Sequence, residues 1–238
     1  MYCRSTLIAT VLLLGVSVHA QPLSYDPYYV LPGGSGHASV DLGVQTLDLN
    51  GLIDATNVLA MAKFSASDPI EIGAHFTFGF INENAANFSS LVIGGKYKLG
   101  NSGAAIANLV LPAGDIKDPG LSLGIMQSLG INDSFRINAQ MQIAALKGYT
   151  AKDGGKGLVA EMLFEPVKSI SKNLTIYAPL YIRSNSQDSG DLLAINLHPN
   201  IDLSLGDGMV LNTGVSLGLA GKAKAQQLGL FLFILRDM

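Results

Sequence analysis

The sequence is poor in cysteine, tryptophan and charge, and each shortage narrows the classes of protein to consider. Of its 238 residues one is a cysteine, Cys3, and none is a tryptophan. A single cysteine excludes a disulfide within the chain and leaves no cysteine pair for a redox or metal site. Membrane interfaces favour tryptophan and tyrosine, so the absence of tryptophan removes one of these two interfacial residues.

Charged residues make up 14% of the chain, and its 15 lysines and arginines are dispersed along the sequence. The formal net charge is −3. Nucleic-acid binding needs a concentrated basic face, so we expect no nucleic-acid partner. With 27 glycines and 48% hydrophobic residues, the chain is too apolar for a disordered protein and too rich in glycine for a helical bundle.

Long apolar runs are missing, and the longest one lies near the N-terminus. Residues 7–18 are almost wholly apolar, Arg4 precedes them, and Val18-His19-Ala20 fits the small-x-small cleavage rule. This run of about 12 residues is shorter than the ~20 that a membrane-spanning helix needs. We predict a cleaved signal peptide over residues 1–20, and a single membrane anchor is the alternative.

The rest of the chain alternates apolar and polar residues. Between Leu193 and Leu219 two such segments flank the turn Gly206-Asp207-Gly208, and residues 70–81 show the same pattern. Side chains of a strand alternate between two faces, so this period of two predicts strands with one apolar and one polar face.

This pattern predicts about 12 strands. In the first of them the alternation of apolar and polar residues shifts by one position near Thr46, as a β-bulge would cause. The expected ranges are 39–49, 56–65, 70–81, 90–99, 104–112, 120–129, 134–145, 157–165, 173–183, 193–205, 209–219 and 225–235. The second range has apolar residues on both sides, so its faces are not assigned.

The predicted connections alternate in length. Short links rich in turn residues lie at 66–69, 100–103, 130–133 and 206–208. The link 166–172 belongs to the same series but is longer. The links that alternate with this series along the chain are also longer. Short turns at one end and longer loops at the other are typical of outer-membrane barrels. The predicted fold class is all-β, a closed antiparallel up-and-down transmembrane β-barrel of about 12 strands. It occupies residues 39–238, after an irregular lead-in over 21–38.

Two neighbouring segments carry a family resemblance. Residues 91–99 (LVIGGKYKL) and 108–115 (NLVLPAGD) resemble outer-membrane transporter barrels of the phenol meta-pathway type. In those, a Gly-x-Lys-Tyr strand precedes a strand that ends in Leu-Pro-x-Gly-Asp. The resemblance implies an uptake pore, often for apolar or aromatic solutes. The chain departs from the usual barrel terminus, because it ends in Arg236-Asp237-Met238 and not in an aromatic residue.

We predict no catalytic residue, and a barrel enzyme is an alternative that needs a serine and a histidine on neighbouring strands. Outside the predicted signal peptide the histidines are His37, His75 and His198. The two Gly-x-Ser-x-Gly segments, 120–124 (GLSLG) and 214–218 (GVSLG), lie within predicted strands and not at a strained nucleophile turn. His198 and Ser204 share a strand face but lie roughly 20 Å apart.

We also predict no metal site and no cofactor. Glu71 and His75 share a strand face, but they are about 13 Å apart and cannot bind one ion together.

The polar faces themselves are the predicted site. If the apolar faces contact lipid, the polar side chains line a lumen. The predicted lumen-lining residues are Glu71, His75, Lys96, Lys98, Arg136, Gln140, Glu161, Tyr177, Tyr181, Arg183, His198 and Asp202. The positive charges of Lys96, Lys98, Arg136 and Arg183 favour anionic groups, and the rings of Tyr177 and Tyr181 suit stacking on aromatic rings.

About 12 strands lies between the ~8 whose interior is filled and the ~16 that leave an open channel, so we expect a narrow or gated conduit. The predicted function is an outer-membrane porin-like channel or transporter. Its predicted partners are membrane lipid and a small, apolar or aromatic solute. The alternative is a secreted soluble β-sandwich, whose apolar faces pack together while its polar faces contact water.

Overall fold

A computed structural model gives the fold, and it describes residues 32–46, 56–81, 85–111, 119–147, 156–185, 193–220 and 229–237. These residues form strands, turns and short irregular segments. None of them forms a helix that is long and apolar enough to cross a membrane. The predicted signal peptide lies outside the described residues, and residues 32–37 of the predicted lead-in form a turn but no strand.

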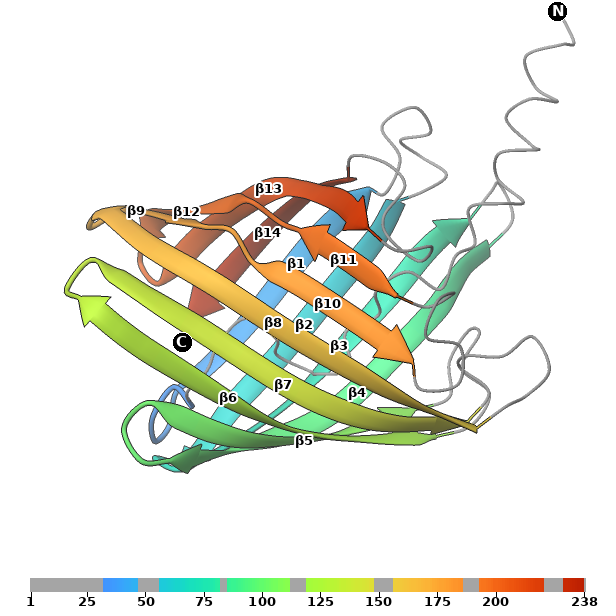
Figure 1. The fold of residues 1–238 in the computed structure, drawn as a ribbon. Coiled ribbons are helices and arrows are strands. Elements are labelled where there is room, and N and C mark those ends of the chain that lie inside the picture. Colours follow the sequence, from blue (N-terminus) through green and yellow to red (C-terminus); the bar gives the residue numbers. More distant parts are fainter. Residues whose placement is uncertain are drawn as a thin grey trace, which may run out of the picture.

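All the strands belong to one antiparallel sheet of 14 strands. They are β1 (Ala38–Thr46), β2 (Thr56–Ser67), β3 (Ile70–Ile81), β4 (Ala85–Leu99), β5 (Gly103–Leu111), β6 (Gly120–Asn132), β7 (Phe135–Lys147), β8 (Lys156–Ser171), β9 (Leu174–Tyr177), β10 (Leu180–Asn185), β11 (Ala194–Leu197), β12 (Asn200–Gly206), β13 (Met209–Ala220) and β14 (Gly229–Asp237). Figure 1 shows the sheet curving, so that β1 to β4 lie behind β7, β8 and β10.

Every strand pairs with at least two others. From β1 to β8 each strand pairs with its neighbours in the chain, which is the predicted up-and-down order. At the other side of the sheet β14 pairs with both β1 and β13. Each strand therefore has a hydrogen-bonded partner strand on both of its sides.

The predicted count of about 12 strands is wrong, because two of the predicted strands are each divided in two. The predicted strand 173–183 is interrupted at Ala178-Pro179, between β9 and β10, and the strand 193–205 at His198-Pro199, between β11 and β12. Proline has no backbone N–H to donate to a ladder. The carbonyl of Pro179 still accepts a hydrogen bond from the N–H of His198, at 2.9 Å, so the two interruptions lie side by side.

The connections confirm the predicted difference between the two ends of the sheet. At one end, turns of two or three residues lie at 68–69, 100–102, 133–134, 172–173 and 207–208. At the other end, five connections of eight or nine residues span 47–55, 112–119, 148–155, 186–193 and 221–228. The connection 82–84 is an exception with three residues, because β4 begins at Ala85, before the predicted strand 90–99. We call these the turn end and the loop end.

The expected long link at 166–172 is wrong, because β8 continues through Pro166 to Ser171 and leaves a turn of two residues. In the last turn Gly206, Asp207 and Gly208 have φ of 89°, 52° and 72°, a region that glycine and aspartate tolerate best.

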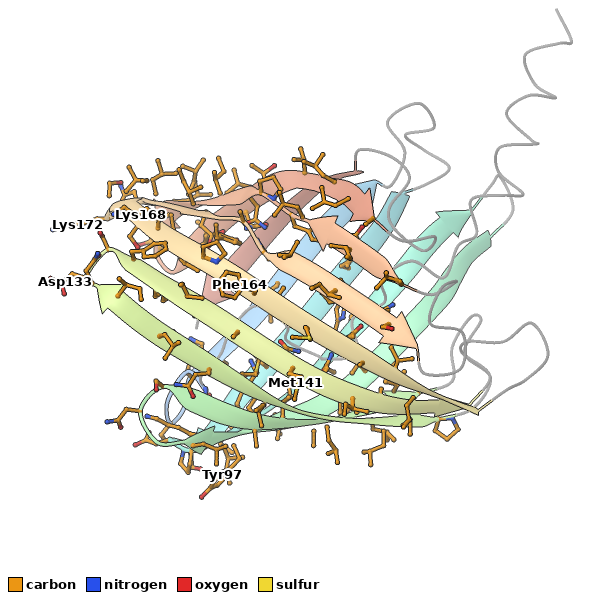
Figure 2. The ribbon with its side chains drawn as sticks, in the orientation of Figure 1. Tyr97, Asp133, Met141, Phe164, Lys168 and Lys172 are labelled. Carbon is orange, nitrogen blue, oxygen red and sulfur yellow. The ribbon has the colours of Figure 1, made fainter. Side chains whose placement is uncertain are left out.

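Burial follows the alternation of the sequence, with the apolar side chains on the exposed face. Leu123, Ile125, Met141 and Phe164 are 47–56% exposed, and Figure 2 labels the last two on β7 and β8. The polar residues between them are buried. A soluble sandwich buries its apolar faces between two sheets; that alternative is wrong, because all strands belong to one sheet and the apolar face is exposed.

Candidate functional site

One continuous row of cross-strand pairs crosses the buried face from the turn end to the loop end. Its successive pairs are Ser65–Glu71, Glu71–Lys96, Lys96–Ile106, Ile106–Gly124, Gly124–Gln142, Gln142–Glu161 and Glu161–Arg183. Glu71 follows the turn 68–69, whereas Arg183 lies two residues before the end of β10. The row therefore places one ion pair near each end of the sheet, with Ile106 and Gly124 between them.

The first ion pair joins β3 to β4 near the turn end. Lys96 Nζ lies 3.7 Å from Glu71 Oε1, and both side chains are at most 1% exposed. Glu71 Oε2 accepts hydrogen bonds from the Gly33 N–H at 3.2 Å and from Ser65 Oγ at 3.4 Å. These contacts neutralise the charge of Lys96 and attach the segment before β1 to the turn end of the sheet.

The second ion pair joins β8 to β10. Arg183 Nε donates to Glu161 Oε1 at 2.6 Å, and a terminal guanidinium nitrogen of Arg183 and the Tyr181 hydroxyl donate to the same oxygen. The Gln142 amide donates to Glu161 Oε2. The guanidinium also lies 5.6 Å from the centre of the Tyr181 ring. Donors from β7 and β10 thus hold a carboxylate of β8, and the charge of Arg183 is compensated.

Two further carboxylates lie on the part of the buried face formed by β8 to β13, which we call the wall. The hydrogen bonds described for them come from neutral groups. Asp202 Oδ1 accepts from the Tyr177 hydroxyl and from the Asn212 amide, each at 2.6 Å. Glu165 Oε1 accepts from the Asn138 amide at 2.7 Å. The wall formed by β8 to β13 is therefore rich in carboxylates and amides.

The buried face of β4 to β6 is mostly apolar. Val92, Ala104, Ile106, Val110 and Met126 are each at most 3% exposed. Val92 is paired with Val110, and Ala104 with Met126, so these side chains are neighbours. This apolar strip separates the two ion pairs and offers a surface for an apolar group.

The structure places most of the predicted site residues on the buried face. Glu71, His75, Lys96, Gln140, Glu161 and Arg183 are buried, whereas Lys98, Tyr177, Tyr181, His198 and Asp202 are partly exposed. Arg136 is exposed near the turn end. Lys96 and Arg183 are paired with carboxylates, so the expectation that they attract anionic groups is wrong for these two residues.

Several buried polar residues are missing from the predicted site. They are Asp41, Lys63, Ser122, Asn138, Gln142, Asn196, Asn200 and Asn212. The same alternation would have found most of them, because they occupy polar positions of strands in which apolar and polar residues alternate. Lys63 is different, because β2 has apolar residues on both sides and its faces could not be assigned.

The serine and histidine considered for an enzyme lie apart. His198 packs its ring edge-on against Tyr181, with 6.5 Å between the ring centres. Ser204 is exposed beside the turn 207–208. In the part of the chain that the structure describes, no group of three or more histidine, cysteine or acidic residues is arranged to hold a metal ion.

No protein-family model matches the sequence, and no curated protein matches it. Solved structures do match. An outer-membrane channel from Pseudomonas putida F1 has a TM-score of 0.63 at 13% identity, over 92% of this chain and 100% of that chain. The NanC porin has a TM-score of 0.63 at 7% identity, over 84% of this chain and 99% of that chain. The KdgM porin has a TM-score of 0.57 at 9% identity, over 83% and 98%.

The fold is that of the outer-membrane β-barrels. At these identities the similarity is one of fold, and function does not follow from fold alone. The resemblance to the phenol meta-pathway family has no matching family model beside it, so it stays a prediction. In the β-barrel, the buried face is the interior and the exposed apolar face is the outer surface.

Proposed function

We propose that this protein is an outer-membrane β-barrel channel that binds small solutes and lets them diffuse through its interior, without a covalent step. One observation carries the proposal. Large apolar side chains such as Leu121, Ile143 and Leu158 are 49–52% exposed, whereas Glu71, Lys96 and Glu161 are 1–2% exposed. This is the reverse of a soluble protein, and it suits a closed barrel with hydrocarbon outside and a polar lumen inside.

The proposal includes the export of the chain, its division into segments and its orientation in the membrane. Residues 1–20 serve as the signal peptide, and residues 39–238 form the membrane domain after the lead-in. Bacterial outer-membrane barrels have short periplasmic turns and longer extracellular loops. The turn end therefore faces the periplasm and the loop end faces outward. Membrane lipid is the permanent partner of the outer surface.

The interior favours a narrow path for a solute with an apolar or aromatic part. The two ion pairs occupy space at both ends of the row, which supports a narrow or gated conduit. Val92, Ile106, Val110 and Met126 supply an apolar wall between them. The half-buried rings of Tyr177 and Tyr181 suit aromatic stacking. A KdgM porin has been solved in complex with disordered oligogalacturonate, so a protein of this fold binds a solute.

Fractionation of cells that produce the full chain tests the location. We expect the mature protein in the outer-membrane fraction, shortened by about 20 residues at the N-terminus as the cleavage rule requires. It should migrate faster on a gel when unheated than when boiled, because a barrel stays folded in detergent. Recovery from the soluble fraction, with no heat-dependent mobility, would disprove the proposal.

Ion selectivity in a planar bilayer tests the path. Arg136 occupies an inward position of β7, paired with Val167, and is exposed at the turn end. Arg136→Glu should shift the reversal potential toward cation selectivity, because the charge stands at the mouth of the lumen. Lys168→Glu is the matched control, because Lys168 is on the outer face of β8 near the same end (Figure 2). Equal shifts for the two variants would argue against a conducting interior.

A further inference from the structure

The interior wall of β8 to β13 contains a carboxylate whose charge is not compensated by its described contacts. Asp202 accepts hydrogen bonds from Tyr177 and Asn212, which are both neutral, and both donors reach Oδ1. Among the described contacts, none reaches its other oxygen, Oδ2. Arg183 is bound to Glu161, and Arg136 is exposed at the turn end, so neither cation neutralises Asp202.

A buried acceptor lies directly beside this carboxylate. Asn200 is 5% exposed, and its Oδ1 has no hydrogen-bond partner within the described ranges. It lies two residues from Asp202 on the same face of β12 and directly opposite Tyr177 of β9. On β7, Gln140 has a second buried acceptor of this kind, Oε1. Buried acceptors are nearly always satisfied, so these oxygens call for a donor beyond the described residues, a role that a solute can fill.

The chemistry of the ligand follows from what these groups lack. They offer acceptor oxygens, a negative charge and aromatic rings, and they need N–H donors and a positive charge. A primary ammonium group has three donors, no acceptor and one positive charge. Tyrosine rings also attract cations. A carboxylate or phosphate would instead be repelled by Asp202.

We propose that Asp202, Asn200 and Tyr177 form a binding site for the protonated primary amine of a solute inside the barrel. The ammonium donates to Asp202 Oδ2 and Asn200 Oδ1 and lies against the Tyr177 ring. The apolar remainder of the solute extends into the lumen. This site rests on the proposed function, because the solute reaches it through the barrel.

Calorimetric titration of the detergent-purified full chain at pH 7 tests the site. The probes are 2-phenylethylamine, 2-phenylethanol and phenylacetate, which share a ring and differ in charge. We expect the amine to bind at least about tenfold more tightly than the alcohol, since a charge-assisted hydrogen bond is worth that ratio or more. Phenylacetate should not compete with it. Equal binding of the three probes would overturn the proposal.

Variants locate the site on the wall. Asp202→Asn and Asn200→Ala should each weaken amine binding by about tenfold. Tyr177→Phe keeps the ring and should keep the preference for the amine, which makes it the conservative variant. Asp133→Asn, in the exposed turn 133–134, is the matched control and should bind like the unaltered protein. Identical behaviour of the Asp202 and Asp133 variants would refute the site.

The two proposals fail in different ways. Heat-dependent gel mobility and bilayer conductance without preferential binding of the amine would remove this site and leave the channel. Preferential binding of the amine by a protein that lacks conductance would remove the channel and leave the site.

Discussion

At the scale of single residues, the interior depends on charges that occur in pairs. Glu161 receives its hydrogen bonds from Gln142, Tyr181 and Arg183, so both oxygens of the carboxylate have donors and the charge of the guanidinium is compensated. Removing one member of a buried pair leaves an uncompensated charge, which costs far more than the pair contributes in total. The Glu161–Arg183 pair should therefore tolerate joint replacement better than single replacement.

A double-mutant cycle tests this pairing. Arg183→Met should lower the free energy of unfolding by about 3–5 kcal/mol, whereas Glu161→Leu combined with Arg183→Met should recover most of that loss. Urea unfolding in detergent micelles, followed by gel mobility, gives the energies. Lys168→Met is the control: this exposed lysine donates to Ser134 Oγ at 2.7 Å, and its loss should change stability by under about 0.5 kcal/mol. Additive effects in the cycle would contradict the pairing.

At the scale of the strand, glycines of β6 differ in what surrounds them. A Cβ on Gly124 would lie 2.5 Å from the carbonyl oxygen of Met141 and 2.6 Å from the Cβ of Gln142, whereas a Cβ on Gly130 would meet nothing within 4 Å. Gly124 sits in the row between Ile106 and Gln142. A side chain there would push β6 away from β7.

Gly124→Ala should therefore destabilise the barrel by about 1–3 kcal/mol, the usual cost of overpacking. Gly130→Ala, in the same strand and near the turn 133–134, is the matched control and should cost little. The midpoint of thermal unfolding, read from gel mobility after heating, compares the two variants. If both variants lose stability equally, the close approach of β6 and β7 at Gly124 is not what constrains that position.

The division of two strands also belongs to this scale. Pro179 and Pro199 lie on neighbouring stretches of the sheet, and each follows a residue without strand pairing. Proline restricts the backbone conformation of the residue before it and has no N–H to donate. The hydrogen-bond ladders of both strands are therefore interrupted at neighbouring positions of the sheet. The carbonyls of Pro179 and Pro199 still accept hydrogen bonds from His198 and Val215, which holds the wall together across the break.

At the scale of the whole molecule, the exposed apolar face predicts a dependence on membrane depth. Ile125 and Ile131 occupy the same face of β6 and are 56% and 60% exposed. Ile125 lies near the middle of the strand, and Ile131 lies beside the turn 133–134. In lipid, Ile125 is therefore near the midplane and Ile131 near the interface.

Ile125→Arg should cost about 2–4 kcal/mol in a lipid bilayer, and Ile131→Arg about 0–1 kcal/mol, because the penalty for a charge falls toward the interface. Reversible unfolding in lipid vesicles measures both values. In a water-soluble protein both substitutions would be nearly neutral, since both side chains are exposed. Small and equal effects would thus place this face in water and not in hydrocarbon.

The alternation in the sequence by itself determined most of the architecture. Residues 70–81 match β3 at both ends, because apolar and polar residues alternate there without a break and turn residues precede them. The order of short turns and longer connections also followed from local chemistry, since glycine, asparagine and aspartate mark tight turns. The same period of two placed Glu71, Glu161 and Arg183 on the polar face, which the structure buries.

The tertiary structure alone decided which polar side chains meet. Glu71 and Lys96, or Glu161 and Arg183, are neighbours only through the register between strands, and no single strand contains that information. The register also put Asn200 opposite Tyr177 and beside Asp202. Alternation assigns a side chain to a face, whereas hydrogen bonding between backbones far apart in the chain selects its partner. That is why the faces were readable from the sequence and the ion pairs were not.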